Sequence, residues 1–125
     1  MSEPLPNCID LENTFFGLAI IHPEIILSTD ISSSDFFLHK NRDLWEILVK
    51  LARGNTSPDF AVITNEFAEN EYFGEYGGAA WLNELTSYGT YSNTNNVDYL
   101  ISEIKEQAYR RKLINYAGEI TRNAF

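Results

Sequence analysis

The C-terminal end of the chain carries a helical pattern that is longer than a domain of this size is wide. Apolar residues recur at intervals of three and four from residue 97, and the pattern resumes after a shift near Arg111. A helix from Val97 to about Ala124 would be about 40 Å long, whereas a domain of 125 residues is about 30 Å across. The far end should therefore overhang the core and expose an apolar stripe that needs a partner. The stripe comprises Val97, Leu100, Ile101, Ile104 and Ala108, followed by Leu113, Tyr116, Ala117 and Ile120.

The rest of the sequence divides into shorter segments with helical periodicity. The clearest break is His22-Pro23, because proline disfavours helix in the residue before it. Residues 62–64 are β-branched and could indicate a strand, but the apolar positions around them repeat at three and four, which favours a helix. We therefore predict an all-α fold, a compact bundle of about five to six helices that ends in the long helix. The shorter predicted segments are residues 9–21, 23–29, 40–54, 60–70 and 77–87.

Three residues are placed as helix caps. Gly54 follows the last apolar position of its helix, where a left-handed C-cap is common. Asp59 and Asn96 precede helical segments and can accept hydrogen bonds from the first free backbone amides. We predict that Asp59 and Asn96 are N-caps and that Gly54 is a left-handed C-cap.

Two adjacent glycines, Gly77 and Gly78, stand directly before a run of helix formers. A phosphate-binding loop is one interpretation, but Glu75 precedes the pair and no basic residue lies within twenty positions on either side. The other interpretation is that a glycine with positive φ lets Tyr76 and the following helix pack closely. The sequence favours packing.

The charge distribution argues against direct nucleic-acid binding. The net charge is -9, and no Lys or Arg occurs between Arg53 and Lys105. Binding to phosphates depends on basic side chains, so the middle of this chain should repel a nucleic acid. Tyr88, Tyr91 and Tyr99 are therefore predicted to lie at the edge of the core rather than to stack on bases.

The sequence lacks the nucleotide-binding and metal-binding motifs that an independent enzyme would carry. The sequence has no G-x-x-x-x-G-K-[ST] or G-x-G-x-x-G motif, and neither His22 nor His39 has neighbours with metal-site spacing. Cys8 is the single cysteine, so no internal disulfide can form. No apolar run is long enough to span a membrane, and no secretion signal opens the chain. We expect a cytoplasmic domain that is not an enzyme and binds no cofactor of its own.

The order of motifs resembles the N-terminal domain of the replicative hexameric DNA helicases of the DnaB family, along nearly the whole chain. The residues "PNCIDLENTFFG" are similar to the opening of that family, and the pair Gly77-Gly78 followed by Leu82 and Leu85 is similar to its Gly-Gly…Leu signature. Asn41, Val62, Leu100 and Phe16 depart from the usual residues, which suggests a divergent member related to phage proteins. The matching positions are Glu12, Gly17, Asp35, Phe36, Arg42, Trp45, Asp59, Gly77, Gly78, Leu82, Leu85 and Asn96.

This resemblance implies an all-α head, about residues 6–96 here, followed by a hairpin of two helices. Residues 97–124 would be the first hairpin helix, and Phe125 would lie inside a longer protein. The family assembles with itself into dimers and six-membered rings through these parts, and it recruits primase and, in some members, a loader. ATP and Mg would bind a C-terminal RecA-like domain that this chain lacks. The predicted contact residues lie on the exposed side of the last helix: Arg110, Arg111, Leu113, Tyr116 and Ile120.

Two other functions remain open. The chain could be a free-standing regulator, for instance a phage protein that copies the helicase head and binds helicase or primase. It could also be a DNA-binding helical domain, which predicts salt-sensitive binding. A reading frame that continues past Phe125 into a Walker A motif would distinguish the helicase from the regulator.

Overall fold

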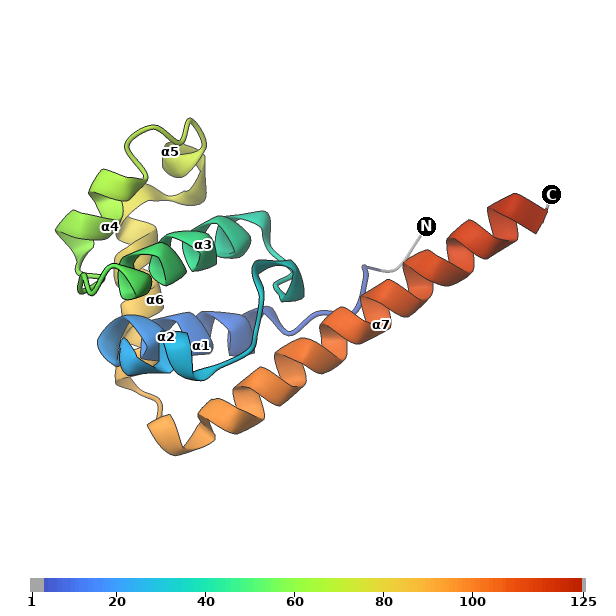
Figure 1. The fold of residues 1–125 in the computed structure, drawn as a ribbon, viewed down its shortest axis with the longest axis horizontal. Helices are drawn as coiled ribbons and strands as arrows, with labels where there is room; N and C mark the ends of the chain where they lie inside the picture. The colour runs from blue at the N-terminus through green and yellow to red at the C-terminus, as the bar shows by residue number, and fades with distance from the viewer. Residues whose placement is uncertain (1–3, 125) are drawn as a thin grey trace.

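The computed structural model describes residues 4–124, and within that range the fold is entirely helical. A head formed by residues 4–96 holds the shorter helices, and the last helix runs out of it (Figure 1). The all-α prediction is confirmed. The α-helices are α1 (Ile9–Ile21), α2 (Glu24–Ser28), α3 (His39–Arg53), α4 (Phe60–Glu66), α5 (Phe73–Tyr76), α6 (Gly78–Thr90) and α7 (Val97–Ala124), with 3-10 turns η1 (Ser33–Asp35) and η2 (Thr94–Asn96).

Helix α1 is the centre of the head. Its sequence is apolar on nearly all sides, and it contacts α2, α6 and α7. Phe15, Phe16 and Leu18 are fully buried, whereas Ile21 at its end is 38% exposed. The helix stops at His22, directly before Pro23, as predicted. A helix that is buried on several sides needs no single apolar stripe.

Four aromatic rings fill the space between α1, α3 and the turn that follows η1. Phe16 and Phe36 have ring centroids 4.7 Å apart, and Trp45 lies 5.8 Å from Phe36 and 5.5 Å from Phe15. Because large rings in tilted contact bury much apolar surface, this cluster fixes where η1 and α3 sit against α1.

Helix α3 is amphipathic, and it ends differently from our prediction. Leu44, Leu48 and Leu51 face the core. Gly54 has a φ of -90°, so the prediction of a left-handed glycine cap is wrong. The next residue, Asn55, takes the left-handed conformation with a φ of 55°. Asparagine tolerates this region better than most residues, so the turn forms one position later.

The segment with β-branched residues forms helix α4. The Asp59 carboxylate accepts a hydrogen bond from the Val62 amide at 3.0 Å, which makes Asp59 the predicted N-cap. Ile63 is fully buried and Phe67 is 1% exposed, at the spacing of one helical turn. Burial on one face therefore outweighs the β preference of the intervening residues.

Helix α6 begins at the paired glycines. Gly77 has a φ of 112° and Gly78 a φ of 57°, both in the left-handed region. A Cβ on Gly77 would lie 2.9 Å from Trp81 Cβ, and the Tyr76 and Trp81 ring centroids are 5.6 Å apart. These contacts agree with the packing interpretation of the pair.

The link between α6 and α7 is a solvent-exposed turn. Asn93, rather than Asn96, accepts a backbone hydrogen bond there, from the Asn95 amide at 2.8 Å. Asn96 ends η2, which runs directly into α7. Tyr91 is 90% exposed and Tyr99 is 60% exposed, so the prediction that they edge the core is wrong.

Helix α7 spans 28 residues and leaves the head partway along its length (Figure 1). Leu100, Ile104, Ala108 and Arg111 are buried against the head, and every residue from 112 to 124 is exposed or partly exposed. We call residues 97–111 the base of α7 and residues 112–124 the arm. No helix among residues 4–124 is long and apolar enough to cross a membrane.

Candidate interaction surface

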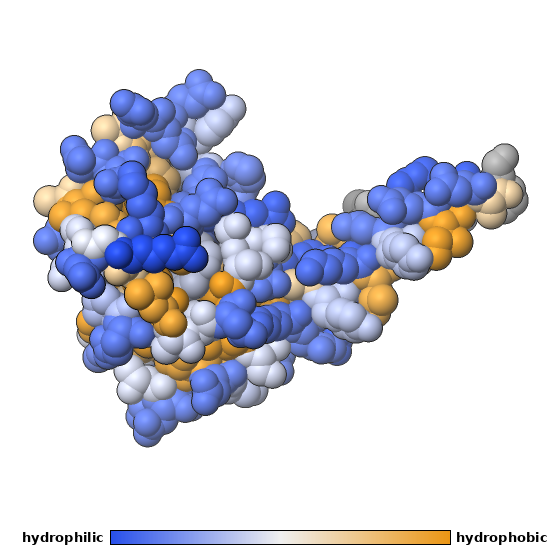
Figure 2. All heavy atoms as spheres, in the orientation of Figure 1, coloured by the Kyte–Doolittle hydropathy of each residue, from blue (hydrophilic) through white to orange (hydrophobic). Residues whose placement is uncertain are grey.

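From Tyr109 onward, through the arm, α7 carries an apolar side chain on almost every turn, and these side chains are exposed to solvent. Tyr109, Leu113, Tyr116 and Ile120 follow one another at spacings of four, three and four, and they are 49 to 64% exposed. This spacing is the one that two packed helices share in a coiled coil. We call these four residues the outer stripe. Figure 2 shows apolar atoms along one side of the arm and hydrophilic atoms along the other.

The outer stripe points away from the head. An α-helix turns about 100° per residue, so Tyr109 and Ile120 lie about 160° to 180° around the helix from Arg111. Arg111 belongs to the face that is buried against the head. The two apolar stripes of α7 are therefore on opposite sides of one helix, rather than one stripe with a small shift. A partner that covers the outer stripe can approach without displacing the head.

Among the predicted contact residues, Arg110 is exposed and Arg111 is not. The Arg110 Nε donates to Glu106 Oε1 at 3.1 Å, a pair one turn apart on the surface of the helix. Such exposed pairs contribute little to stability. Arg110 lies beside the outer stripe and remains available to a partner.

Arg111 is 6% exposed, so its predicted place on the exposed side is wrong. Its guanidinium donates to the Pro6 carbonyl at 2.9 Å and to the Asp35 carbonyl at 2.8 Å. The same group lies over the Phe37 ring, 5.4 Å from the centroid. A buried guanidinium requires such partners, because an unpaired charge in the interior is costly.

Glu12 is the buried carboxylate of the same region and is 1% exposed. It accepts hydrogen bonds from the Phe37 amide at 2.8 Å and from Asn41 Nδ2 at 3.0 Å. Burial raises the pKa of Glu12 above its usual value, while these hydrogen bonds and the charge of Arg111 act in the opposite direction. Burial in turn lowers the pKa of Arg111. We call Glu12, Asn41, Phe37 and Arg111 the buried junction.

The remaining motif residues make contacts that hold the head together. The carboxylate of Asp35 accepts from the Ser32 amide in a capping box, and Arg42 Nε donates to the Phe36 carbonyl at 2.8 Å. Leu82 and Leu85 are buried in α6. Gly17 lies where α1 crosses α6, and a methyl group there would overlap the Leu85 carbonyl and the Gly89 amide.

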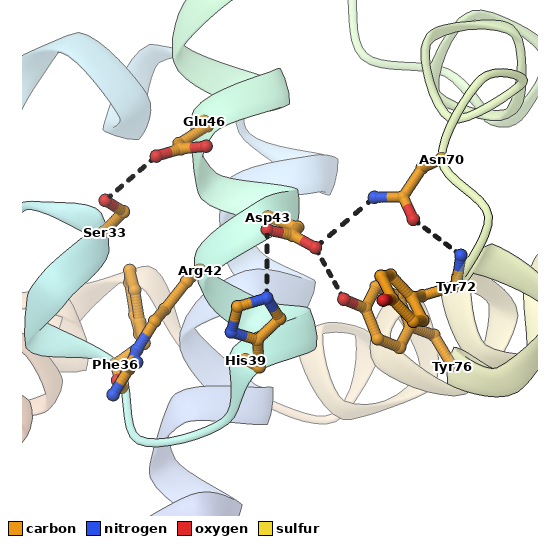
Figure 3. A network of polar contacts seen from close by, with 9 residues as sticks. All are labelled: Ser33, Phe36, His39, Arg42, Asp43, Glu46, Asn70, Tyr72 and Tyr76. Atoms are coloured by element: carbon orange, nitrogen blue, oxygen red, sulfur yellow. Dashed lines mark hydrogen bonds and ion pairs between the residues drawn. The ribbon is translucent and has the colours of Figure 1, made fainter.

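Two features were not singled out from the sequence. Gly89 is the partner of Gly17 at the helix crossing, and only the three-dimensional contact makes it significant. Asp43 joins α3 to α5 and to the loop before it: it accepts from Tyr76 Oη at 2.6 Å and from Asn70 Nδ2 at 3.3 Å (Figure 3). Burial, with the contact to Asp43, raises the pKa of Tyr76 above its usual range. The His39–Asp43 spacing of four was the one available signal, and those side chains are 3.9 Å apart.

Among residues 4–124, the head has a surface groove but no cluster of metal-ligating side chains. The groove has a volume of about 500 Å³ and lies between the η1 turn and α3, where its lining includes Ile31, Trp45, Val49, Lys50 and Arg53. Within residues 4–124 no three His, Cys, Asp or Glu side chains gather as metal ligands would.

Comparison with known proteins identifies the relatives of this chain. A family model described as the DnaB-like helicase N-terminal domain matches residues 4–106. The replicative DNA helicase DnaB of Geobacillus stearothermophilus is 24% identical over 122 residues, which are 96% of this chain and 26% of that protein. DnaB of Treponema pallidum (strain Nichols) is 28% identical over 123 residues, 96% of this chain and 27% of that protein.

A solved structure has the same fold. The crystal structure of the N-terminal domain of DnaB helicase from Mycobacterium tuberculosis matches with a TM-score of 0.85 and 19% identity, over 95% of this chain and 86% of that one. The chain spans about a quarter of the length of the curated relatives. Because the family match extends over most of the sequence, the chain belongs to the family of DnaB-like helicase N-terminal domains.

Proposed function

We propose that this chain is the non-catalytic N-terminal domain of a replicative DNA helicase, which assembles subunits into a hexameric ring and recruits primase or a helicase loader. The exposed outer stripe of α7 is the observation that carries the proposal. Leu113 and Ile120 are about half exposed on a helix that has left its own core. An apolar stripe of this kind is stabilised when another protein covers it.

The proposed division of labour places the chemistry elsewhere. In the whole protein, ATP and Mg would bind the RecA-like domain, and this domain would need no cofactor. Its acidic character supports a role in protein contacts rather than in holding DNA, since the net charge is -9. Membrane contact forms no part of the proposal.

The test uses the whole protein that carries this chain. Leu113→Ala and Ile120→Ala together should reduce the hexamer fraction and the co-sedimentation of primase, while each subunit still binds nucleotide. Alanine keeps the helix propensity high, so unwinding of α7 would not explain the loss. Unchanged assembly and unchanged primase binding would rule out the arm as the contact surface.

The alternative function, a free-standing regulator, differs from the helicase in where the reading frame should end. A reading frame that ends at Phe125, together with binding of the 125-residue chain to an intact helicase or primase, would favour the regulator. A frame that continues into G-x-x-x-x-G-K-[ST] would favour the helicase.

A further inference from the structure

We propose that Arg111 is a positioning residue, which clips the N-terminal segment (residues 4–8) across the base of α7 and thereby holds the last turn of α7 before the arm. The proposal goes beyond the proposed function, because it concerns how the arm is held and does not depend on which protein binds it. It rests on the buried junction and on the position of that junction where α7 leaves the head.

The guanidinium of Arg111 joins three segments that are far apart in the sequence. One terminal nitrogen donates to the Pro6 carbonyl, 105 residues earlier, and the other donates to the Asp35 carbonyl, 76 residues earlier. In Figure 1 the start of the chain runs beside α7 at this point. The planar, fixed arrangement of the guanidinium donors lets one side chain hold both carbonyls at once.

No apolar side chain of α7 beyond Ala108 is buried against the head. On the face turned to the head, Leu100, Ile104 and Ala108 are buried, and Arg111 is the last residue of that face to be buried. The same face continues with Asn115 and Gly118, neither of which is buried. Without Arg111, the last fixed point of the helix would move back by about one turn, to Ala108.

Glu12 holds the surroundings of the guanidinium in place. It accepts from the amide of Phe37, and the ring of Phe37 lies under Arg111. The Glu12 carboxylate also supplies a negative charge close to the buried guanidinium. The clip therefore consists of one cation on α7, one anion on α1, and two carbonyl acceptors on the N-terminal segment and η1.

Arg111 could instead stabilise the head as a whole, without holding α7 in particular. Amide hydrogen exchange on the 125-residue chain separates these two roles, because it reports each segment by itself. The measurement is made at low protein concentration, so that assembly does not protect the arm and a failure of the proposed function would not affect the result.

We expect Arg111→Lys to accelerate exchange of the amides of residues 108–116 by about tenfold or more, because two charge-assisted hydrogen bonds are disrupted. Residues 44–51 of α3 should exchange as in the wild type. Arg110→Lys is the matched control: it changes the neighbouring exposed arginine and should leave all segments unchanged. Uniform acceleration over the head, or no acceleration at residues 108–116, would overturn the proposal.

Removal of residues 1–6 provides the second variant. It deletes the Pro6 acceptor and leaves Arg111 and Glu12 intact. The same local acceleration at residues 108–116 is expected. If exchange there is unchanged in the truncated chain, the N-terminal segment does not hold α7, and the proposal fails even if Arg111→Lys does not fold.

Discussion

Glu12 is a carboxylate that the fold keeps in its interior. Burial raises its pKa in the folded protein above the usual value of 4.5. The folded state therefore binds the proton more tightly than the unfolded state does. The stabilisation from protonating Glu12 is fully present below a pH of about 4.5 and is lost as the pH rises through the folded pKa.

Glu12→Gln tests this linkage. Relative to the variant, the wild type should become more stable as the pH falls from neutral toward about 4.5. Chemical denaturation of both proteins across this pH range measures the difference. Glu84→Gln, at an exposed position on α6, is the control for replacing a carboxylate with an amide. If the stability of the wild type relative to Glu12→Gln does not change with pH, or increases toward neutral pH, the pKa of Glu12 is not raised in the folded protein.

Cys8 lies next to the same junction, and its thiol should react slowly. Burial, with the charges of Glu12 and Glu103, raises the pKa of Cys8 from 9.0 to about 11. At a pH of about 8 the thiolate fraction is then about a hundredfold lower than that of an unperturbed thiol, and the thiolate is the reactive form. Alkylation by iodoacetamide should be slower by about that factor than in urea-unfolded protein. Equal rates in the folded and unfolded chain would show that the fold does not raise the pKa of Cys8.

At the level of elements, the crossing of α1 and α6 depends on two glycines. A methyl group on Gly17 or on Gly89 would overlap backbone atoms of the other helix, and backbone cannot move aside as a flexible side chain can. Gly17→Ala and Gly89→Ala should each lower the free energy of unfolding by about 1–3 kcal/mol or more, as overpacked sites do.

Gly118→Ala is the matched control for the crossing. Gly118 lies on α7, and its nearest neighbour would be an Arg122 side-chain atom at 3.8 Å. Alanine there should leave stability unchanged or raise it by up to about 1 kcal/mol, because alanine favours helix. Thermal unfolding followed by circular dichroism compares the three variants. Equal effects at the three positions would mean that helix propensity, and not close approach, decides the result.

Some elements could be predicted from sequence because their cause is local. Asp59 caps α4 through an amide three residues away, and Gly77 supplies the left-handed turn that α6 needs. Gly54 shows the limit of this reasoning: the neighbouring Asn55 can also adopt positive φ, and the sequence does not say which of the two does so. The role of Gly89 depends on its contact with α1, which the sequence around it does not indicate.

For the whole molecule, the arm was predictable and its anchoring was not. The length of the helical pattern predicted an overhang, and α7 runs from Val97 to Ala124 as expected. Arg111 looks like an exposed charge in a basic run, yet it is buried by contacts with Pro6 and Asp35. Partners so distant along the chain leave no periodic signal. The Asp43 contacts in Figure 3 escaped prediction for the same reason.

The two faces of α7 give the molecule its proposed mode of action. One face attaches the helix to the head through Leu100, Ile104 and Ala108, and the opposite face presents the outer stripe. Lys105 also forms an ion pair of 2.6 Å with Asp30 on the loop after α2, although such an exposed pair adds little to the attachment. The head can therefore carry the arm to a partner without losing its own core.

Sedimentation equilibrium of the 125-residue chain tests the central claim most directly, that the outer stripe is a protein contact surface. The wild type should show a mean mass that rises with concentration, and Leu113→Ala, Tyr116→Ala and Ile120→Ala together should abolish the rise. The control variant replaces exposed apolar residues of the head, Leu27, Tyr72 and Tyr91, with alanine and should associate like the wild type. A wild type that stays monomeric at all concentrations, or a stripe variant that associates equally well, would contradict the account.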